Sequence, residues 1–162
     1  MELALSERSE RDRPRQPRRC RRGIDRLDPA SGRVERYAER GSVPDKALWS
    51  VLADRAGRLW VGHARGLRVY ELQSGKFRDL PVDAARADAL PRGSVDLLVE
   101  ADDGAIWASA DGGGIVRIDP AALAITRYDD ADGLRSVDIG QIGFAADGAL
   151  LAASAAGLDR MD

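Results

Sequence analysis

The sequence is poor in the residues from which many catalytic and metal sites are built. Among its 162 residues there is one cysteine, Cys20, and one histidine, His63. A single cysteine excludes an internal disulfide and a cysteine-rich zinc site, and a single histidine excludes a site built on paired histidines within this chain. We therefore expect neither a metal ion nor a cofactor.

Long apolar runs and lysine are also scarce. No stretch approaches the roughly 18 apolar residues that a membrane helix needs. Residues 1–7 lack the basic and apolar regions of a signal peptide. Only Lys46 and Lys76 are lysines, whereas glycine occurs 17 times. Frequent glycine predicts frequent turns, and hence many short strands in an all-β protein.

The first 22 residues differ in charge from the rest of the chain. They hold eight arginines against four acidic residues, and they are almost free of apolar residues after Leu5. This composition predicts a disordered, arginine-rich head over 1–22. An arm that touches nucleic acid or acidic lipid is the alternative, but the head lacks the aromatic residues that stack on bases. We therefore expect no nucleic-acid partner.

Three sequence patterns recur in the same order with nearly the same period. The first, Gly–apolar–x–x–apolar–acid, recurs at intervals of 43, 48 and 43 residues, beginning at residues 23, 66, 114 and 157. The second is a glycine three residues before Trp or Leu, at 57–60, 104–107 and 148–151. The third is a short run that ends in Tyr or Leu, at 34–37, 77–80 and 125–128. Periods of this length indicate a repeat architecture.

Each full repeat divides into four short runs joined by tight turns, which predicts an antiparallel meander. In the first full repeat the expected strands are 48–53, 58–63, 66–71 and 76–80. In the second they are 95–100, 105–109, 114–118 and 124–128. Partial repeats at the two ends add 24–27, 34–37, 138–144, 149–154 and 157–161, so that 13 strands are predicted.

Apolar residues occupy both faces of these strands. Leu67 and Tyr70 are three positions apart and so point to opposite faces. A sheet that is apolar on both faces must be covered on both, as are the stacked blades of a β-propeller, which closes with four to eight blades. We predict a partial β-propeller of about three four-stranded antiparallel blades at a period of 43–48 residues, not closed. The expected blades are 23–37 (partial), 48–80, 95–128 and 138–162 (partial).

Two segments resemble the two-component regulator propeller repeat, 56–77 (AGRLWVGHARGLRVYELQSGKF) and 103–125 (DGAIWASADGGGIVRIDPAALAI). The positions that match its pattern are Asp54, Gly57, Leu59, Trp60, Gly62, Gly66, Leu67, Ser74, Gly75 and Phe77, followed by Gly104, Trp107, Gly114, Arg117, Asp119 and Ile125. The sequence departs from the pattern where His63 replaces Thr, Leu123 replaces the turn Gly and Leu151 replaces Trp.

This resemblance implies the sensor region of a bacterial signalling receptor, typically a hybrid histidine kinase or a diguanylate cyclase. It implies a periplasmic location and a longer parent protein that is membrane-anchored and dimeric. The catalytic output domain of such a parent is absent from this chain, so we expect no enzymatic activity and no catalytic residues here.

The candidate ligand-binding residues lie at the ends of strands and on the longer connections. The longer connections 38–47, 81–94 and 129–137 are expected on one face of the propeller, together with the strand end at His63 and Arg65 and with Asp111. Binding function tends to lie on such loops. The candidates are His63, Arg65, Arg86, Arg92, Asp111 and Arg135.

The recurring tryptophans and glycines have a structural interpretation. Trp60 and Trp107 could stack on a carbohydrate, but their recurrence among apolar residues favours packing between blades. The Asp-Gly turns could suggest Ca²⁺, but they offer one or two carboxylates each where that ion needs six to eight oxygens. The expected structural positions are Gly57, Trp60, Gly66, Gly104, Trp107, Gly114, Gly148 and Gly157.

Three classes of function stay open at this stage. We predict a sensor or ligand-binding segment whose partner is an unknown small molecule or glycan, or the neighbouring blades and domains of a longer chain. A scaffold for protein–protein interaction is the alternative. A propeller lyase or glycosidase is favoured least, because lyases of this kind would want paired histidines and a metal.

Overall fold

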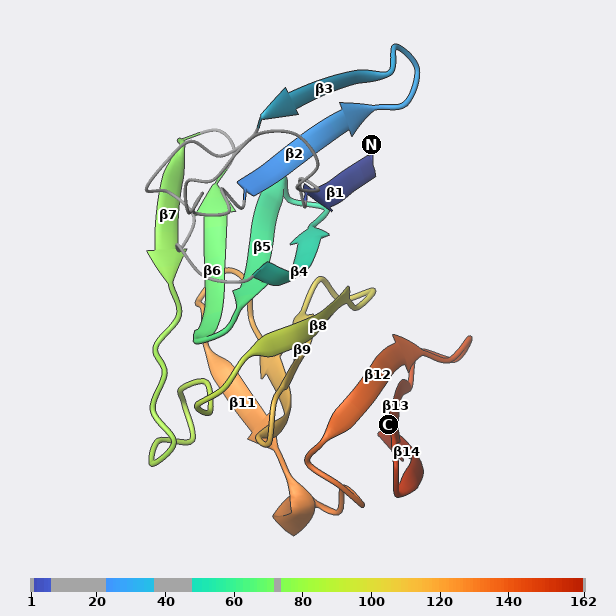
Figure 1. Ribbon diagram of the computed structural model, residues 1–162. Coiled ribbons are helices and arrows are strands. Elements are labelled where there is room, and N and C mark those ends of the chain that lie inside the picture. Colours follow the sequence, from blue (N-terminus) through green and yellow to red (C-terminus); the bar gives the residue numbers. More distant parts are fainter. Residues whose placement is uncertain (1, 7–22, 37–47, 72–73, 162) are drawn as a thin grey trace, which may run out of the picture.

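The computed structural model describes residues 2–6, 23–36, 48–71 and 74–161, and Figure 1 shows their arrangement. These residues form 14 strands in four antiparallel sheets, each ordered as a simple meander. The sheets follow one another in space in chain order, and within the described residues they form an open arc rather than a closed ring. The predicted all-β, partial propeller is therefore confirmed.

The first sheet contains β1 (Glu2–Ser6), β2 (Gly23–Asp28) and β3 (Arg33–Arg36). The second contains β4 (Leu48–Ala53), β5 (Arg58–His63), β6 (Gly66–Glu71) and β7 (Lys76–Asp79). The third contains β8 (Val95–Glu100), β9 (Ile106–Ala110), β10 (Gly114–Ile118) and β11 (Ile125–Tyr128). The short 3₁₀ helix η1 (Asp130–Asp132) precedes the fourth sheet, which contains β12 (Ile139–Phe144), β13 (Leu150–Ser154) and β14 (Gly157–Met161).

One hairpin has the same register in all four sheets. In each case the last residue of one strand pairs with the glycine that opens the next, in the pairs Ser6↔Gly23, His63↔Gly66, Ala110↔Gly114 and Ser154↔Gly157. The first sheet is therefore a blade built on the same plan as the other three, with β1 in the place that β5, β9 and β13 occupy.

The prediction of a disordered head over 1–22 is wrong for its first residues. Glu2–Ser6 form β1, which pairs with β2 along five residues and raises the strand count from the expected 13 to 14. The physical reason is that β2 would otherwise present an unpaired backbone edge. The other head residues, 7–22, lie outside the described part of the chain. They connect β1 to β2, where the corresponding hairpins need only two or three residues.

One turn position takes a left-handed backbone in three sheets. Gly32 and Gly75 hold it with φ of 68° and 67°, and Leu123 holds the same place with φ of 55°. A non-glycine residue pays a steric cost in this region. Leu123 is partly buried against the apolar cluster between the second and third sheets, and this packing offsets the strain.

Apolar side chains fill the space between each pair of neighbouring sheets, with the two faces of a strand serving different interfaces. In β5, Leu59 packs towards the first sheet and Trp60 packs towards the third. A third cluster around Ile115 and Ile142 joins the third sheet to the fourth. The prediction that the blades are buried on both faces holds for the two central sheets.

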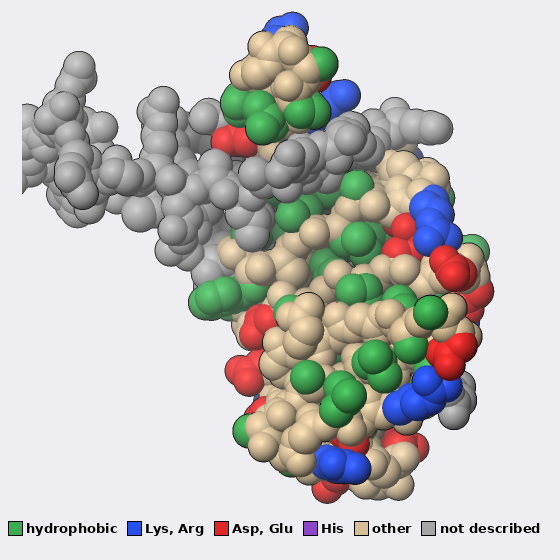
Figure 2. Space-filling model, turned by 90° about the vertical axis from the view of Figure 1, so that its right-hand side faces the viewer, with side chains coloured by type: hydrophobic (Ala, Val, Ile, Leu, Met, Phe, Trp, Pro, Cys, Tyr) green, Lys and Arg blue, Asp and Glu red, His purple; other side chains and the backbone are tan. Residues whose placement is uncertain are grey.

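The outer faces of the arc are open. Strands β2, β6, β10 and β14 each begin with a glycine, and in the first three of them the residue that follows it faces the next sheet along the chain. The residue at this position is 0% exposed at Ile24, 1% at Leu67 and 0% at Ile115, but 58% exposed at Leu158. At the other end, Val34 of β3 is 61% exposed. Seen from the side on which β12–β14 lie, the molecule carries hydrophobic side chains across its middle and charged side chains along one edge (Figure 2).

A buried carboxylate joins the second and third sheets. Asp54 accepts hydrogen bonds from Trp60 Nε1 at 2.8 Å and from Arg58 Nε at 2.6 Å, and its side chain is fully buried. Arg58 Nη1 donates onward to the carbonyl oxygen of Pro120 at 2.5 Å. The network therefore connects the β4–β5 turn to the turn between β10 and β11.

Candidate functional site

The candidate residues gather at one end of the blades, which we call the loop end. It comprises the hairpin turns at 64–65, 111–113 and 155–156 and the connections 81–94 and 129–138. The expected connection 38–47 lies outside the described residues. These pieces touch one another: the backbone N–H of Asp111 donates to the carbonyl oxygen of Ser94 at 2.9 Å, and that of Gly114 donates to Val137 at 3.0 Å. The β9–β10 hairpin thus contacts both the connection that enters its own blade and the connection that leads to the next blade.

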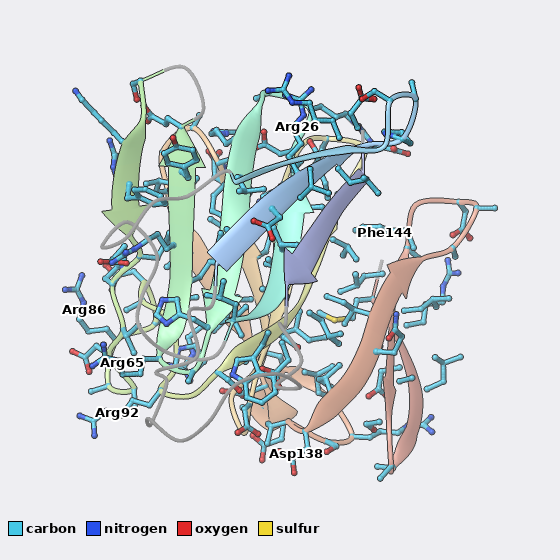
Figure 3. All side chains as sticks on the ribbon, turned by 45° about the horizontal axis from the view of Figure 1, so that its top comes forward. Arg26, Arg65, Arg86, Arg92, Asp138 and Phe144 are labelled. Atoms are coloured by element: carbon cyan, nitrogen blue, oxygen red, sulfur yellow. The ribbon has the colours of Figure 1, made fainter. Side chains whose placement is uncertain are left out.

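Three of the predicted arginines lie at the loop end. Figure 3 shows Arg65, Arg86 and Arg92 along one side of the molecule, with Arg26 at the far end. All three are exposed. Arg86 forms an ion pair with Asp88 at 2.7 Å. The group can present cationic hydrogen-bond donors to an anionic or strongly polar ligand.

His63 is close to this group but faces inwards. It is 7% exposed, and its Nδ1 accepts a hydrogen bond from the backbone N–H of Arg65 at 3.3 Å. Burial lowers the pKa of His63, the nearby Asp79 carboxylate opposes that shift, and Arg68 adds to it. Hydrogen bonds from Arg68 in turn hold the pKa of Asp79 below its usual range. This Arg68–Asp79 pair beside His63 has no signal in the sequence, because the two residues are eleven positions apart and meet only through the pairing of β6 with β7.

The two remaining candidates have different surroundings. Asp111 is exposed, and its carbonyl oxygen lies so close to Gly93 that a Cβ on that glycine would come within 2.6 Å of it. Asp111 is therefore next to the chain segment that carries Arg92. Arg135 lies on the following connection and forms an ion pair with Asp159 of β14, Nε to Oδ1 at 3.2 Å. The structure thus places Asp111 beside the segment that carries Arg92, and it assigns Arg135 to a contact with the fourth sheet.

Sequence reasoning missed a set of bulged residues on the first strand of each blade. The pairing shifts by one residue between Leu48 and Ser50, and the same shift recurs in β8 and β12. The extra residues are Trp49, Asp96 and Gly140, all exposed, and Trp49 is 55% exposed. They lie at the loop end because each bulge is opposite a hairpin residue such as His63. A β-bulge changes the direction in which a side chain points, and no residue pattern in the sequence predicts these bulges.

The two recurring tryptophans differ in their environment. Trp60 is fully buried between the second and third sheets. Trp107 is only partly buried and stacks on Tyr128 with ring centroids 5.5 Å apart. It lines a cavity of about 360 Å³ between the third and fourth sheets, together with Tyr128, Phe144 and Met161.

Neither a metal site nor a membrane helix is found in the part of the chain that the structure describes. Among those residues no three His, Cys, Asp or Glu side chains are grouped as metal ligands would be. No helix formed by them has the length and apolar character that crossing a bilayer requires.

Solved structures resemble this chain in fold. The extracellular domain of BT4673 from B. thetaiotaomicron, a proposed hybrid two-component system, superposes with a TM-score of 0.68 at 19% identity, covering 86% of this chain and 18% of that one. The extracellular domain of BT3049 from the same organism, also a proposed hybrid two-component system, gives 0.66 at 18% identity, with 86% and 22% covered. A streptogramin B lyase gives 0.58 at 19% identity, with 85% and 47% covered.

These similarities show the fold alone, because each lies below 25% identity. This chain spans about a fifth of the length of the two extracellular domains. No family model matches the sequence, and no curated protein matches it. The chain thus has the fold of part of a propeller-like domain.

Proposed function

We propose that this chain is a non-catalytic sensor segment of a longer propeller in a bacterial two-component-type receptor, and that its loop end contributes to a ligand-binding surface. The observation that carries the proposal is the open arc, in which Leu158 is 58% exposed although its three counterparts are 0–1% exposed. Burying a leucine side chain stabilises a protein by roughly 1.5–3 kcal/mol. A further blade stacked on β14 would recover that free energy.

The resemblance to the two-component regulator propeller repeat supports the same proposal. The first two solved structures named above are extracellular domains of proposed hybrid two-component systems. In each, residues beyond the region covered by this chain make up most of the domain. We propose an extracytoplasmic location for this chain on the same grounds, in a parent that is membrane-anchored and dimeric.

The loop end suggests the chemistry of the ligand. Arg65 and Arg92 supply positive charge, whereas that of Arg86 is balanced by Asp88, and the exposed Trp49 supplies a flat apolar surface at the same end. Aromatic faces and cationic donors at one end of a domain suit a carboxylate-bearing sugar or another small anion. We therefore propose an acidic small molecule or glycan as the ligand.

A binding experiment tests this ligand class. Titration calorimetry of the 162-residue chain would use an oligogalacturonide as the acidic probe and maltohexaose as the neutral one. We expect the acidic probe to bind more tightly, and the double variant Arg65→Ala/Arg92→Ala to lose that preference. The matched control, Arg26→Ala, removes an arginine from the far end and should leave binding unchanged. Equal affinity for the two sugars, or equal effects of Arg65→Ala/Arg92→Ala and Arg26→Ala on binding, would refute the assignment of the binding site to the loop end.

The coding sequence around this segment tests the receptor assignment separately. We expect further blade repeats, one membrane helix and a kinase or cyclase domain downstream. Neighbouring protein-interaction domains without a membrane helix would favour the scaffold alternative. Paired histidines and acidic residues in adjoining blades would favour an enzyme. One of the solved structures with a similar fold is a streptogramin B lyase.

A further inference from the structure

The hairpin turn between β5 and β6 is held by a histidine side chain. His63 is the last residue of β5, and its Nδ1 accepts a hydrogen bond from the backbone N–H of Arg65 at 3.3 Å. Neither Ala64 nor Arg65 has a positive φ, so the turn is not one of the mirror-image types that match the twist of a two-residue hairpin. The hydrogen bond to His63 therefore helps to hold a turn that the backbone alone does not favour.

The turn between β13 and β14 has the same construction with a different acceptor. In it Ser154 pairs with Gly157, whose φ of 131° is close to the 128° of Gly66. The Ser154 Oγ accepts a hydrogen bond from the backbone N–H of Ala156 at 3.2 Å. A hydroxyl oxygen keeps its acceptor lone pairs at any pH, whereas an imidazole loses its acceptor nitrogen when it is protonated. Of these two turns, only the one closed by His63 can be broken by a proton.

The surroundings of His63 disfavour a positive charge on its ring. The ring is 7% exposed, and its pKa is lowered chiefly by burial. Among the described residues, the charged groups that act on it are Arg65 in the turn, Arg68 of β6 and Asp79 of β7, and β4 carries no charge. Both carboxylate oxygens of Asp79 already accept hydrogen bonds from the Arg68 guanidinium, at 2.5 Å and 2.6 Å. A protonated ring is therefore more stable in water than in this position.

The turn is connected to the loop end in two ways. Arg65 is itself exposed there, as Figure 3 shows. Gly66 lies against the connection 81–94, so closely that a Cβ on this glycine would be 2.8 Å from Cγ2 of Val82. The same connection carries Arg92. A change in the turn therefore displaces one arginine of the loop end and removes a contact from the segment that holds another.

We propose that His63 is a proton-operated switch that regulates the loop end. At neutral pH the uncharged ring holds the turn and keeps Arg65 in place. When the ring takes up a proton, the N–H of Arg65 loses its acceptor, the ring moves towards water and the turn opens. An acidic ligand then binds more weakly, because a direct charge-assisted hydrogen bond from Arg65 outweighs the attraction of a distant, screened charge. The effect on the ligand rests on the proposed function, whereas the opening of the turn does not.

Nuclear magnetic resonance tests the opening of the turn directly, since His63 is the only histidine of the chain. Spectra of the 162-residue chain would follow the His63 ring and the backbone amides of the two turns from pH 7 downwards, until the ring is fully protonated. We expect the ring to titrate below the ordinary pKa of 6.5. The Arg65 amide should shift with the same midpoint, and the Ala156 amide, as the internal control, should not shift.

Two variants separate the role of the acceptor from that of the charge. His63→Ser copies the acceptor of the turn between β13 and β14, and its Arg65 amide should not shift over the same pH range. His63→Ala has no acceptor, so at pH 7 its Arg65 amide should already resemble that of the protonated native chain. Circular dichroism checks that each variant folds. An Arg65 amide that does not follow the ring, the same shift in His63→Ser, or protonation of the ring only when the whole chain unfolds would overturn the proposal.

The oligogalacturonide probe tests the consequence for binding. Protonation of His63 should weaken its binding to the native chain roughly three- to tenfold, through the loss of one charge-assisted hydrogen bond. The affinity of His63→Ser should change by less than about twofold over the same pH range. A turn that opens while the affinity of the native chain stays constant would also overturn the proposal. Absent binding at every pH would refute the proposed ligand instead, and the amide shifts would still decide whether the turn opens.

Discussion

Replacing Asp54 with alanine should destabilise the protein more than any other single carboxylate removal at a turn. The Asp54 side chain is fully buried and accepts hydrogen bonds from Trp60 Nε1 and Arg58 Nε, at 2.8 Å and 2.6 Å, and from the Arg58 backbone N–H. Alanine leaves these donors without an acceptor, next to a guanidinium that is 22% exposed. Removing one partner of a buried ion pair costs about 3–5 kcal/mol, so we expect a loss in that range.

Asp103 supplies the matched control. It also lies in a turn between the first two strands of a blade and also pairs with an arginine, Arg117 at 2.8 Å, but its side chain is 58% exposed. Exposed ion pairs contribute about 0.2–1 kcal/mol. Urea denaturation followed by circular dichroism would give the unfolding free energy of both variants. The two values are compared when the dependence of the unfolding free energy on urea concentration is the same for both. A penalty for Asp54→Ala within about 1 kcal/mol of that for Asp103→Ala would refute the role given to the buried network.

Three further changes test other parts of the fold. Burial lowers the pKa of His63 from its ordinary 6.5, so the unfolded chain takes up a proton before the folded chain does as the pH falls. The unfolding free energy should therefore decrease below about pH 6.5, by at most about 1.4 kcal/mol per pH unit. The variant His63→Asn should show a flatter pH dependence in denaturation measured from pH 7 to 5. Leu123→Gly should change the unfolding free energy by about 1 kcal/mol or less, since relief of the left-handed backbone offsets lost packing, whereas Leu52→Gly, in the same cluster, should cost about 2 kcal/mol or more. Gly62→Ala should cost about 3 kcal/mol or more in urea titrations, because a Cβ there collides with the carbonyl oxygen of Val95 in the next sheet.

The repeat pattern predicted the architecture because each blade repeats the same turn chemistry. Gly57 and Gly104 fix two turns with φ of 78° and 83°, and short apolar runs between such turns leave few choices but a meander. The same reasoning failed for β1. Its run Glu2–Ser6 pairs as β5 does, but the 16 residues from 7 to 22 separate it from β2 and hide it from a search at a period of about 45.

Site prediction depended on features that a linear pattern records only in part. Strand ends and connections identify the loop end, because in a meander alternate turns lie at the same end of the sheet. The same signals do not predict the direction of a side chain. His63 is the last residue of β5 and faces inwards, and Arg135 forms an ion pair with Asp159 of β14. Trp49 was missed because its exposure comes from a bulge, and a bulge is a property of two paired strands rather than of one.

The stability of Leu158→Asp in chains of two lengths tests the central claim most directly, which is that this chain is an open segment of a longer propeller. In the 162-residue chain Leu158 is 58% exposed, so the variant should lose no more than about 0.5 kcal/mol. In a chain extended by the residues that follow in its gene, a further blade should bury Leu158, and the loss should rise to about 4 kcal/mol or more, as for Ile115→Asp. A reading frame that ends at residue 162, or the same small loss in both lengths, would contradict the account.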